Sequence, residues 1–209
     1  MDVVYALLLI VGAFWLGACP FSVWIGRRFL GKDITEYGDH NPGATNVFRA
    51  GGRGFGLLAV FADVLKGTLP ILLAHYHVGL PEPAVYAMAL SSVLGHMYSP
   101  FLGFHGGKAT ATTIGVLLAI PHPDVFVVFI MLMAVMFLFI EMDSDAWEVM
   151  LSGVGLLAYV VFSGKGLWMY LFVASLLIIL GKRHFRGLCE APHIRFKLAD
   201  WLGSVRRWV

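Results

Sequence analysis

Charge is scarce in this chain. Only 13% of its 209 residues are Asp, Glu, Lys or Arg, whereas 59% are hydrophobic and 14% are aromatic. A soluble globular domain carries about 25% charged residues, so this composition excludes an ordinary soluble core. The mean hydropathy of +0.80 is typical of an integral membrane protein.

Cysteine is nearly absent as well, and the chain has no long linker, low-complexity tract or convincing internal repeat. Its two cysteines are Cys19, within an expected membrane span, and Cys189, at the start of an expected cytoplasmic tail. The cytoplasm is reducing, so no disulfide framework is predicted. We expect one domain over 1–209, made of a helical bundle (1–189) and an amphipathic tail (190–209).

Long apolar runs dominate the rest of the chain. A helix needs about 20 apolar residues to cross a bilayer, and this length has room for roughly seven such helices. The sequence therefore predicts an all-α, seven-transmembrane-helix bundle. The expected spans cover 3–25, 54–77, 83–102, 109–121, 124–141, 148–163 and 167–182.

Basic residues indicate the orientation of this bundle. With the N-terminus outside and the C-terminus in the cytoplasm, Lys165 falls in an outside loop and Lys66 within a span. The other basic residues all lie on the cytoplasmic side: Arg27, Arg28, Lys32, Arg49, Arg53, Lys108, Lys182, Arg183, Arg186, Arg195, Lys197, Arg206 and Arg207. This bias follows the positive-inside rule.

The tail carries apolar residues at helical spacing, with basic residues around them. The apolar positions are Ile194, Leu198, Trp201, Leu202, Val205 and Trp208. Such a pattern is typical of a helix that lies on an anionic membrane surface. We expect an anchor at this place rather than a part of the active site.

The polar segment 38–49 is the main exception to the apolar composition. Gly38 and Gly43 permit close approach of a ligand to the backbone, and Arg49 offers a bidentate partner for an anion. Amide and hydroxyl groups come from Asn41, Thr45 and Asn46. The segment predicts a phosphate or carboxylate site. The alternative is a capped loop, in which Asn41 or Thr45 starts a short helix.

A second polar segment begins near the end of the third expected span and contains His96. Farther along, Gly106 and Gly107 precede Lys108 at the start of an expected helix. Backbone amides, an ammonium group and the helix dipole would all attract an anion there. The alternative is a glycine turn followed by a lysine that obeys the positive-inside rule.

Three ionisable residues within or beside the expected spans are candidates for the site. Asp63 and Lys66 are three residues apart, so they share one helical face and can neutralise each other. We favour a polar wall of an active site over a purely structural ion pair. His184, near the cytoplasmic end of the last span, is a candidate base or hydrogen-bonding group. Its alternative is an ordinary interfacial residue.

Together these residues resemble the bacterial acylphosphate:glycerol-3-phosphate acyltransferases, the PlsY family. The similarity runs from about Pro20 to Arg186, and its motifs are 38–49, Asp63 to Gly67, Gly95-His96, Gly106-Gly107-Lys108 and Arg183-His184. It implies a multi-pass enzyme of the bacterial cytoplasmic (inner) membrane, with its active site on the cytoplasmic side. Such enzymes move a fatty acyl group from acyl phosphate to the sn-1 hydroxyl of glycerol 3-phosphate, which gives lysophosphatidic acid and phosphate for phospholipid biosynthesis.

From this resemblance we infer the roles of the site residues. Arg49 and Lys108 hold the charge of the leaving phosphate, while His184 or the substrate phosphate orients the attacking hydroxyl. The substrate-binding set is Asn41, Gly43, Thr45, Asn46, Asp63, Lys66, His96, Gly106 and Gly107. No metal, cofactor or nucleic acid is expected, and the partners are acyl phosphate, glycerol 3-phosphate and membrane lipids, bound by a monomer.

The sequence motifs of other acyltransferases are missing. No His is followed five residues later by Asp, as in the other glycerolipid acyltransferases, and no Gly-x-Ser-x-Gly nucleophile elbow occurs. We therefore expect direct attack of the acceptor hydroxyl on acyl phosphate rather than a covalent acyl-enzyme.

Four departures from the family pattern keep other functions open. Asp39 replaces a serine and would repel phosphate unless it is turned away or paired with a cation such as His40. His105 replaces a lysine, Gly187 replaces an asparagine, and the loop 142–148 is unusually acidic. The alternatives are a divergent or impaired acyltransferase with another acceptor, or a non-enzymatic membrane transporter or lipid-binding protein.

Overall fold

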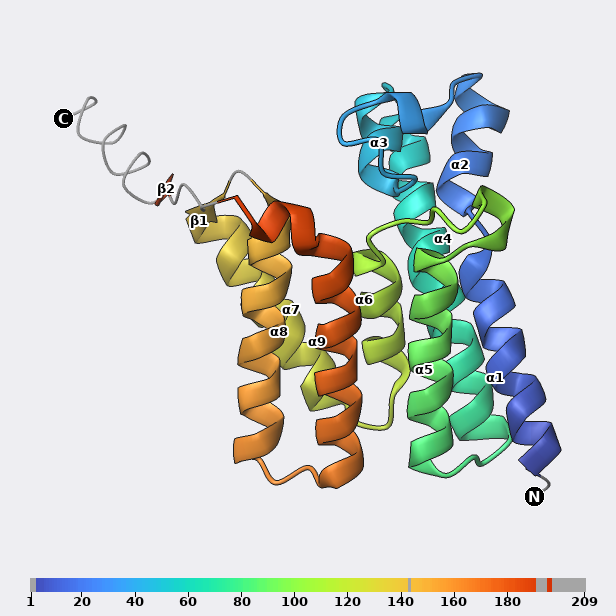
Figure 1. Cartoon of the computed structure of the whole chain (residues 1–209), viewed down its shortest axis with the longest axis vertical. Coiled ribbons are helices and arrows are strands. Elements are labelled where there is room, and N and C mark those ends of the chain that lie inside the picture. Colours follow the sequence, from blue (N-terminus) through green and yellow to red (C-terminus); the bar gives the residue numbers. More distant parts are fainter. Residues whose placement is uncertain (1–2, 143, 191–194, 197–209) are drawn as a thin grey trace. The chain divides into compact units, whose positions relative to one another are not determined.

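The computed structural model describes residues 3–142, 144–190 and 195–196. The chain divides into two compact units, 1–123 and 124–209, and each unit consists mainly of helices (Figure 1). The organisation as a single domain stays a prediction.

The first unit contains four long helices and two short ones. Its α-helices are α1 (Val3–Ala18), α2 (Phe21–Ile25), α3 (Ala44–Arg49), α4 (Arg53–Leu72), α5 (Glu82–Met97) and α6 (Thr110–Ala119). Short 3-10 or π-helical segments extend or join them: η1 (Gly26–Leu30), η2 (Ile34–Glu36), η3 (Leu73–His77) and η4 (Pro100–Leu102). Within this unit α1 lies along α5, and α4 lies along α6.

Within residues 124–142, 144–190 and 195–196, the second unit consists of three helices and one minimal strand pair. The helices are α7 (Pro123–Phe139), α8 (Asp145–Phe162) and α9 (Leu167–Leu188), and α8 packs along α9. Strand β1 (Ile140–Glu141) pairs antiparallel with β2 (Arg195–Phe196). Apart from Glu190 and these two residues of β2, the predicted amphipathic tail lies outside the described residues.

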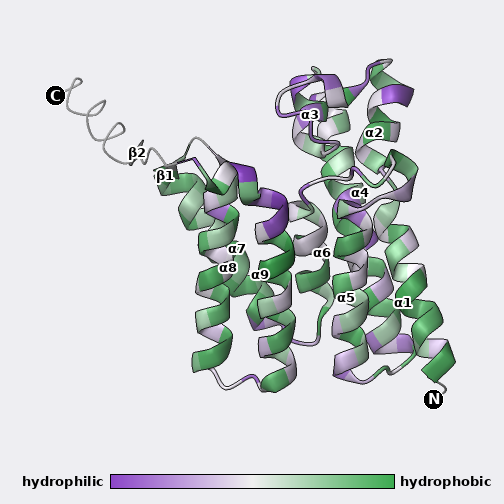
Figure 2. Ribbon diagram, viewed as in Figure 1, coloured by the Kyte–Doolittle hydropathy of each residue, from purple (hydrophilic) through white to green (hydrophobic). Residues whose placement is uncertain are grey.

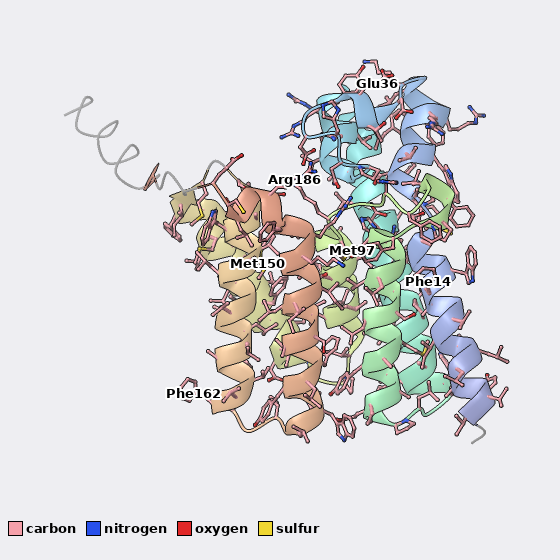
Figure 3. The ribbon with its side chains drawn as sticks, viewed as in Figure 1. Phe14, Glu36, Met97, Met150, Phe162 and Arg186 are labelled. Atoms are coloured by element: carbon pink, nitrogen blue, oxygen red, sulfur yellow. The ribbon has the colours of Figure 1, made fainter. Side chains whose placement is uncertain are left out.

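Hydrophobic residues make up most of the helices (Figure 2). In the described part of the chain, four helical segments are long and apolar enough to cross a membrane: Val3–Leu30, Arg53–His77, Asp145–Phe162 and Leu167–Leu188. Two further apolar helices are shorter, Thr110–Ala119 and Pro123–Phe139. Many large apolar side chains point outward, as Phe162 does at 91% exposure (Figure 3). Apolar surface on this scale requires a lipid environment.

A helix lies at each expected span, but several ends differ from the prediction. The run expected over 3–25 breaks just before Pro20, because the residue that precedes a proline is disfavoured in helical backbone. Helix α5 ends at Met97, ahead of Pro100, which cannot continue the hydrogen-bond ladder. Helix α9 continues to Leu188, beyond its expected end.

Glycines let α1 and α5 approach closely. A Cβ at Gly17 of α1 would overlap the backbone carbonyl of Ser92, and a Cβ at Gly95 of α5 would overlap the carbonyl oxygen of Phe14. The Oγ of Ser91 then donates a hydrogen bond to a carbonyl of α1, that of Ile10, at 2.8 Å. Close backbone packing and interhelical hydrogen bonds are the forces that join helices in lipid.

Glycines also let α4 and α6 approach closely. A Cβ at Gly67 would overlap the carbonyl oxygen of Thr112, and a Cβ at Gly115 would overlap the carbonyl oxygen of Val64. The hydroxyl of Thr68 donates across the contact to the carbonyl of Gly115 at 3.0 Å. The two helix pairs are thus fixed by contacts that tolerate no side chain on the glycines.

We expect Gly17→Ala to destabilise the protein by about 1–3 kcal/mol, because the added methyl overpacks a backbone contact. Gly12→Ala is the matched control on the same helix, since a Cβ at that position meets nothing within 4 Å. Thermal unfolding of both variants in detergent measures the difference. Equal melting temperatures for the two would contradict the close α1–α5 packing.

Candidate functional site

A small apolar core holds the polar segment 38–49 in place. Its buried members come from α2, η2, α3, α4 and their connections: Val23, Ile25, Ile34, Ala44, Val47, Ala50 and Ala59. The Nζ of Lys32 also donates to the carbonyl of Ala50 at 2.7 Å. A six-residue helix such as α3 is unstable alone, so its position depends on this packing.

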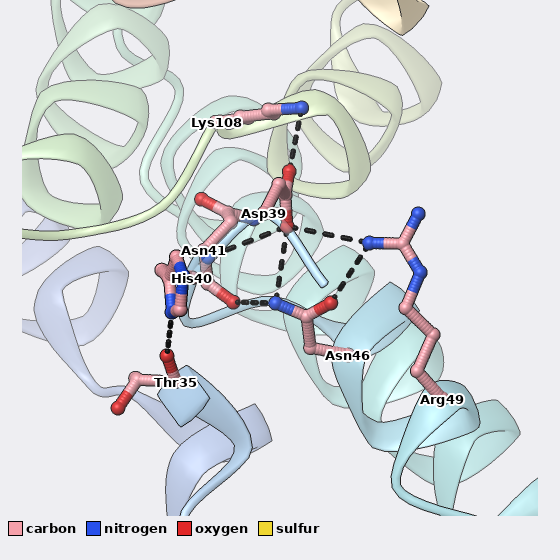
Figure 4. Close-up of polar contacts among 7 residues, drawn as sticks. All are labelled: Thr35, Asp39, His40, Asn41, Asn46, Arg49 and Lys108. Atoms are coloured by element: carbon pink, nitrogen blue, oxygen red, sulfur yellow. Dashed lines mark hydrogen bonds and ion pairs between the residues drawn. The ribbon is translucent and has the colours of Figure 1, made fainter. Parts of the chain in front are cut away.

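The carboxylate of Asp39 lies at the centre of a polar cluster (Figure 4). Its Oδ2 is 2.8 Å from Lys108 Nζ, and its Oδ1 is 3.5 Å from Arg49 Nη1. Oδ1 also accepts hydrogen bonds from Asn46 Nδ2 at 3.0 Å and from the backbone N–H of Asn41 at 3.3 Å. The fold thus brings the two polar segments of the sequence together on one anionic group.

The side chain of Arg49 is held by its neighbours. Its Nη1 donates to Asn46 Oδ1 at 3.0 Å, while Asn46 Nδ2 donates to the carbonyl of Asn41 at 2.8 Å. Gly38 lies directly beside Arg49, at a φ of +56°, and a Cβ there would overlap the guanidinium. Glycine is therefore required at position 38 both for its backbone conformation and for the space that it leaves.

The sequence suggested His40 as a possible cationic partner of Asp39, but His40 does not pair with it. Asp39 is instead paired with Lys108 and Arg49, whereas His40 Nδ1 lies 2.8 Å from the carbonyl oxygen of Thr35. His40 adopts a φ of +59°, in the left-handed region that favours glycine. The contact with Thr35 helps to hold the histidine in this conformation.

Opposing effects set the charge state of Asp39. Partial burial raises the pKa of its carboxyl, but the hydrogen bond and charge of Lys108, with the donors on Asn41 and Asn46, outweigh it and lower the pKa below its ordinary value. The carboxylate is therefore ionised at neutral pH. It neutralises one of the two positive charges that meet there.

Gly106 and Gly107 do not offer their amides to a ligand in the way that the sequence suggested. The N–H of Gly106 donates to the carbonyl of Met97 at 3.0 Å, and that of Gly107 donates to the carbonyl of His96 at 3.1 Å. A Cβ on either glycine would overlap His96. The paired glycines serve to lay the loop on the end of α5, and this contact places Lys108 beside Asp39.

Asp63 and Lys66 form the centre of a second, buried network in the first unit. The ammonium of Lys66 lies 2.7 Å from Asp63 Oδ1 and donates to the carbonyl of Cys19 at 2.9 Å. Ser22 donates to Asp63 Oδ2 at 2.7 Å, and His96 Nδ1 is 3.9 Å from Asp63 Oδ1. Asp63 and Lys66 are each 2% exposed. This geometry favours the structural ion pair over the expected wall of an active site.

The remaining predicted residues of this part of the chain are Gly43, Thr45 and His105. Gly43 occupies the N-cap position of α3, so neither Asn41 nor Thr45 caps this helix, and Thr45 is exposed. His105 is also exposed, and its Nδ1 lies 2.6 Å from the carbonyl oxygen of Gly103. Of the residues expected to contact substrate, Asn41 and Asn46 belong to the Asp39 cluster.

The departure at Gly187, in the second unit, has a packing reason. A Cβ at this position of α9 would overlap the Oγ of Ser144 and approach the Cβ of Ala146 to 2.9 Å. Ser144 is the N-cap of α8, and its Oγ accepts a hydrogen bond from the N–H of Ala146 at 3.2 Å. An asparagine at 187 would therefore clash with the start of α8.

The acidic character of 142–148 also has a structural explanation. Asp145 and Glu148 lie in the first turn of α8, where the helix dipole favours negative charge. His184 belongs to α9 of the same unit and is 2% exposed. Its proximity to the Asp39 cluster of the first unit stays a prediction.

Apolar helices of spanning length define an integral membrane protein, and in its first unit Lys108 and Arg49 meet at the carboxylate of Asp39. A family model for glycerol-3-phosphate acyltransferase matches residues 7–190. The chain belongs to the glycerol-3-phosphate acyltransferase family. This membership confirms the family that the sequence motifs suggested.

Individual relatives agree with this assignment. A glycerol-3-phosphate acyltransferase of Lactococcus lactis subsp. lactis is 33% identical over 88% of this chain and 92% of the relative. The one of Geotalea daltonii is 44% identical over 114 residues, a segment that covers 54% of this chain and 58% of that relative. In several relatives, the matched segment thus spans only half to three fifths of their length.

Solved structures resemble the fold. The crystal structure of PlsY (YgiH), an integral membrane glycerol 3-phosphate acyltransferase, in its glycerol 3-phosphate form, matches with a TM-score of 0.78 and 30% sequence identity. The match covers 88% of this chain and 90% of that one. The helical, membrane-embedded class expected from composition is therefore confirmed.

The short helix η2 should lose stability in acid through its N-cap residue, Asp33. Hydrogen bonds from Thr35 and then from Arg27 lower the pKa of Asp33 to about 2. A carboxyl whose pKa is depressed on folding contributes stability above its unfolded pKa, about 3.9, and loses it as the pH falls through the folded value.

Asp33→Asn should therefore lower the melting temperature at pH 7 but not at pH 2. The change at pH 7 should correspond to less than about 1 kcal/mol, because the Asp33–Arg27 pair is near the surface. Glu36→Gln, an exposed carboxylate three residues away, controls for net charge. If the melting temperatures of wild type and Asp33→Asn differ by the same amount at pH 7 and pH 2, the lowered pKa of Asp33 is contradicted.

Proposed function

We propose that this protein transfers a fatty acyl group from acyl phosphate to the sn-1 hydroxyl of glycerol 3-phosphate. The products are lysophosphatidic acid and inorganic phosphate. One observation carries the proposal: Lys108 and Arg49, from two distant segments, both lie beside the carboxylate of Asp39. Lys108 Nζ is 2.8 Å from this carboxylate and Arg49 Nη1 is 3.5 Å from it. Family membership supports the reaction, and the two matching PlsY crystal structures are described as glycerol 3-phosphate and lysophosphatidic acid forms.

The chemistry suits these residues. The acceptor hydroxyl oxygen attacks the carbonyl carbon of acyl phosphate, the bond from that carbon to the phosphate oxygen breaks, and phosphate leaves with the electron pair. Lys108 and Arg49 stabilise the charge on the phosphate, and orientation of the hydroxyl lowers the barrier further. The hydroxyl proton passes to the substrate phosphate or to His184. The acyl chain lies among the apolar helices.

The proposed topology has seven spans, with the N-terminus outside and the C-terminus and active site on the cytoplasmic side of the bacterial inner membrane. The basic residues support it, because Arg49 and Lys108 fall on the same side as most other cations of the chain. The working form is a monomer.

Acyl transfer to another hydroxyl acceptor is the second candidate. Asp39 favours it, since its carboxylate already neutralises part of the charge that a dianionic acceptor would use. Purified protein in lipid, supplied with acyl phosphate and glycerol 3-phosphate, decides between the candidates. Phosphate release that requires both compounds supports the main proposal, and release that glycerol 3-phosphate does not stimulate would reject it.

Lys108→Ala and Arg49→Ala should each reduce the turnover with acyl phosphate and glycerol 3-phosphate about 10²–10³-fold, as removal of one group that stabilises transition-state charge does in other enzymes. Arg53→Ala is the matched control, because Arg53 is an exposed cation at the start of α4. Phosphate release and lysophosphatidic acid are measured, and the melting temperature reports folding. Wild-type rates in either alanine variant would refute the assignment of the anion site.

Chemical labelling tests the orientation. A cysteine that replaces Lys165 should react with a membrane-impermeant maleimide in intact cells, because the topology places that loop outside. The exposed native Cys189 should react only after the membrane is permeabilised. Labelling of Cys189 in intact cells, with protection of position 165, would reverse the proposed orientation.

A further inference from the structure

The cations of the proposed phosphate site already hold an anion. Lys108, Arg49, Asn46 and the backbone N–H of Asn41 all direct donors to the carboxylate of Asp39. Charged nitrogens, an amide and a backbone N–H are also the donors that a phosphate oxygen accepts. Asp39 therefore occupies positions that a phosphate would need.

We propose that Asp39 is a tethered competitor for the anion site, which substrate phosphate must displace before it can bind to Lys108 and Arg49. This inference rests on the proposed function, because it concerns the same two cations. Asp39 then sets the affinity of the site, because it weakens the binding of every anion by the same factor. Only anions that make the strongest contacts therefore bind at low concentration.

The geometry permits this displacement. The side chain of Asp39 is 38% exposed, and those of Arg49 and Lys108 are 49% and 28% exposed, so solvent anions reach all three. Asp39 stands between Gly38 and His40, which both have positive φ, so it sits on a tight turn rather than inside a helix. A partly exposed ion pair is weak enough for a multivalent anion to replace.

The competition is permanent over the ordinary pH range. The pKa of Asp39 lies below its ordinary value, so the carboxylate remains charged. Because it is part of the chain, its effective concentration at the cations does not fall on dilution. A dianionic phosphate overcomes it with a second charge and additional acceptor oxygens.

The size of the effect follows from the fraction of molecules in which the cations are unoccupied. An apparent dissociation constant equals the intrinsic constant divided by the competent fraction. If the site is open in about one molecule in ten, removal of the Asp39 charge strengthens binding about tenfold. The factor is the same for each anion, because each must displace the same carboxylate.

A different mechanism would give a different pattern. If Asp39 stayed in place beside the bound anion, it would act as a fixed repulsive charge. The Coulomb energy is proportional to the charge of the ligand, so a dianion would then be penalised much more than a monoanion. The relative response of the two kinds of anion therefore separates displacement from fixed repulsion.

The experiment measures binding of sulfate, a dianion, and formate, a monoanion, by calorimetry in chloride-free buffer. Wild type is compared with Asp39→Asn, Asp39→Ser and the control Glu36→Gln, which removes the same charge from an exposed position three residues away. Both Asp39 variants should bind both anions about tenfold more tightly, with an unchanged sulfate-to-formate ratio, and the control should match wild type. Melting temperatures verify folding, and two substitutions guard against a single unstable variant.

Unchanged affinities in both folded Asp39 variants would overturn the proposal. A much larger gain for sulfate than for formate would overturn it in favour of fixed repulsion. Turnover supplies a separate readout: KM for glycerol 3-phosphate should fall about tenfold in Asp39→Ser. If every variant binds anions as expected but none turns over acyl phosphate, the proposed reaction fails while the role of Asp39 as a competitor stands.

Discussion

The buried ion pair of Asp63 and Lys66 is the interaction on which the first unit depends. Pro20 breaks the first apolar run, and Lys66 donates to the carbonyl of Cys19 at this break. Asp63 accepts a hydrogen bond from Ser22 at the start of α2. Either charge alone would be very costly in this environment, and removal of one partner from a buried pair typically costs about 3–5 kcal/mol. The pair therefore holds α1, α2 and α4 in one arrangement.

The same network connects the membrane core with the candidate site. His96 of α5 lies 3.9 Å from Asp63, and Gly107 packs directly against the ring of His96. The position of α5 therefore determines the position of Lys108, which follows Gly107. On the other side of the site, the apolar core under α3 fixes Arg49. Two rigid supports thus bring two cations onto one carboxylate. Two positive charges and one negative charge leave the cluster with one net positive charge, which attracts an incoming anion.

The departures from the family pattern have separate physical explanations. Asp39 occupies the cation cluster, and His40 takes up a backbone conformation that suits glycine. In the second unit, Gly187 faces the N-cap of α8, and Asp145 and Glu148 of the neighbouring loop belong to the first turn of that helix. Gly187 and Ser144 are therefore coupled by packing, so a change at one position would need a change at the other.

The sequence alone determined the membrane class, the approximate positions of the helices and the family, because apolar length, basic bias and motif order are local or one-dimensional properties. It also identified Arg49 and Lys108 as candidates for one site. The helix ends, the use of the Gly106 and Gly107 amides and the partners of Asp39 were decided only by the tertiary structure. The physical reason is that each of these features depends on a neighbour distant in the chain. The packed helices determine which groups lie within hydrogen-bonding distance, and those groups decide whether a carboxylate repels or pairs with its neighbours and whether an amide is available.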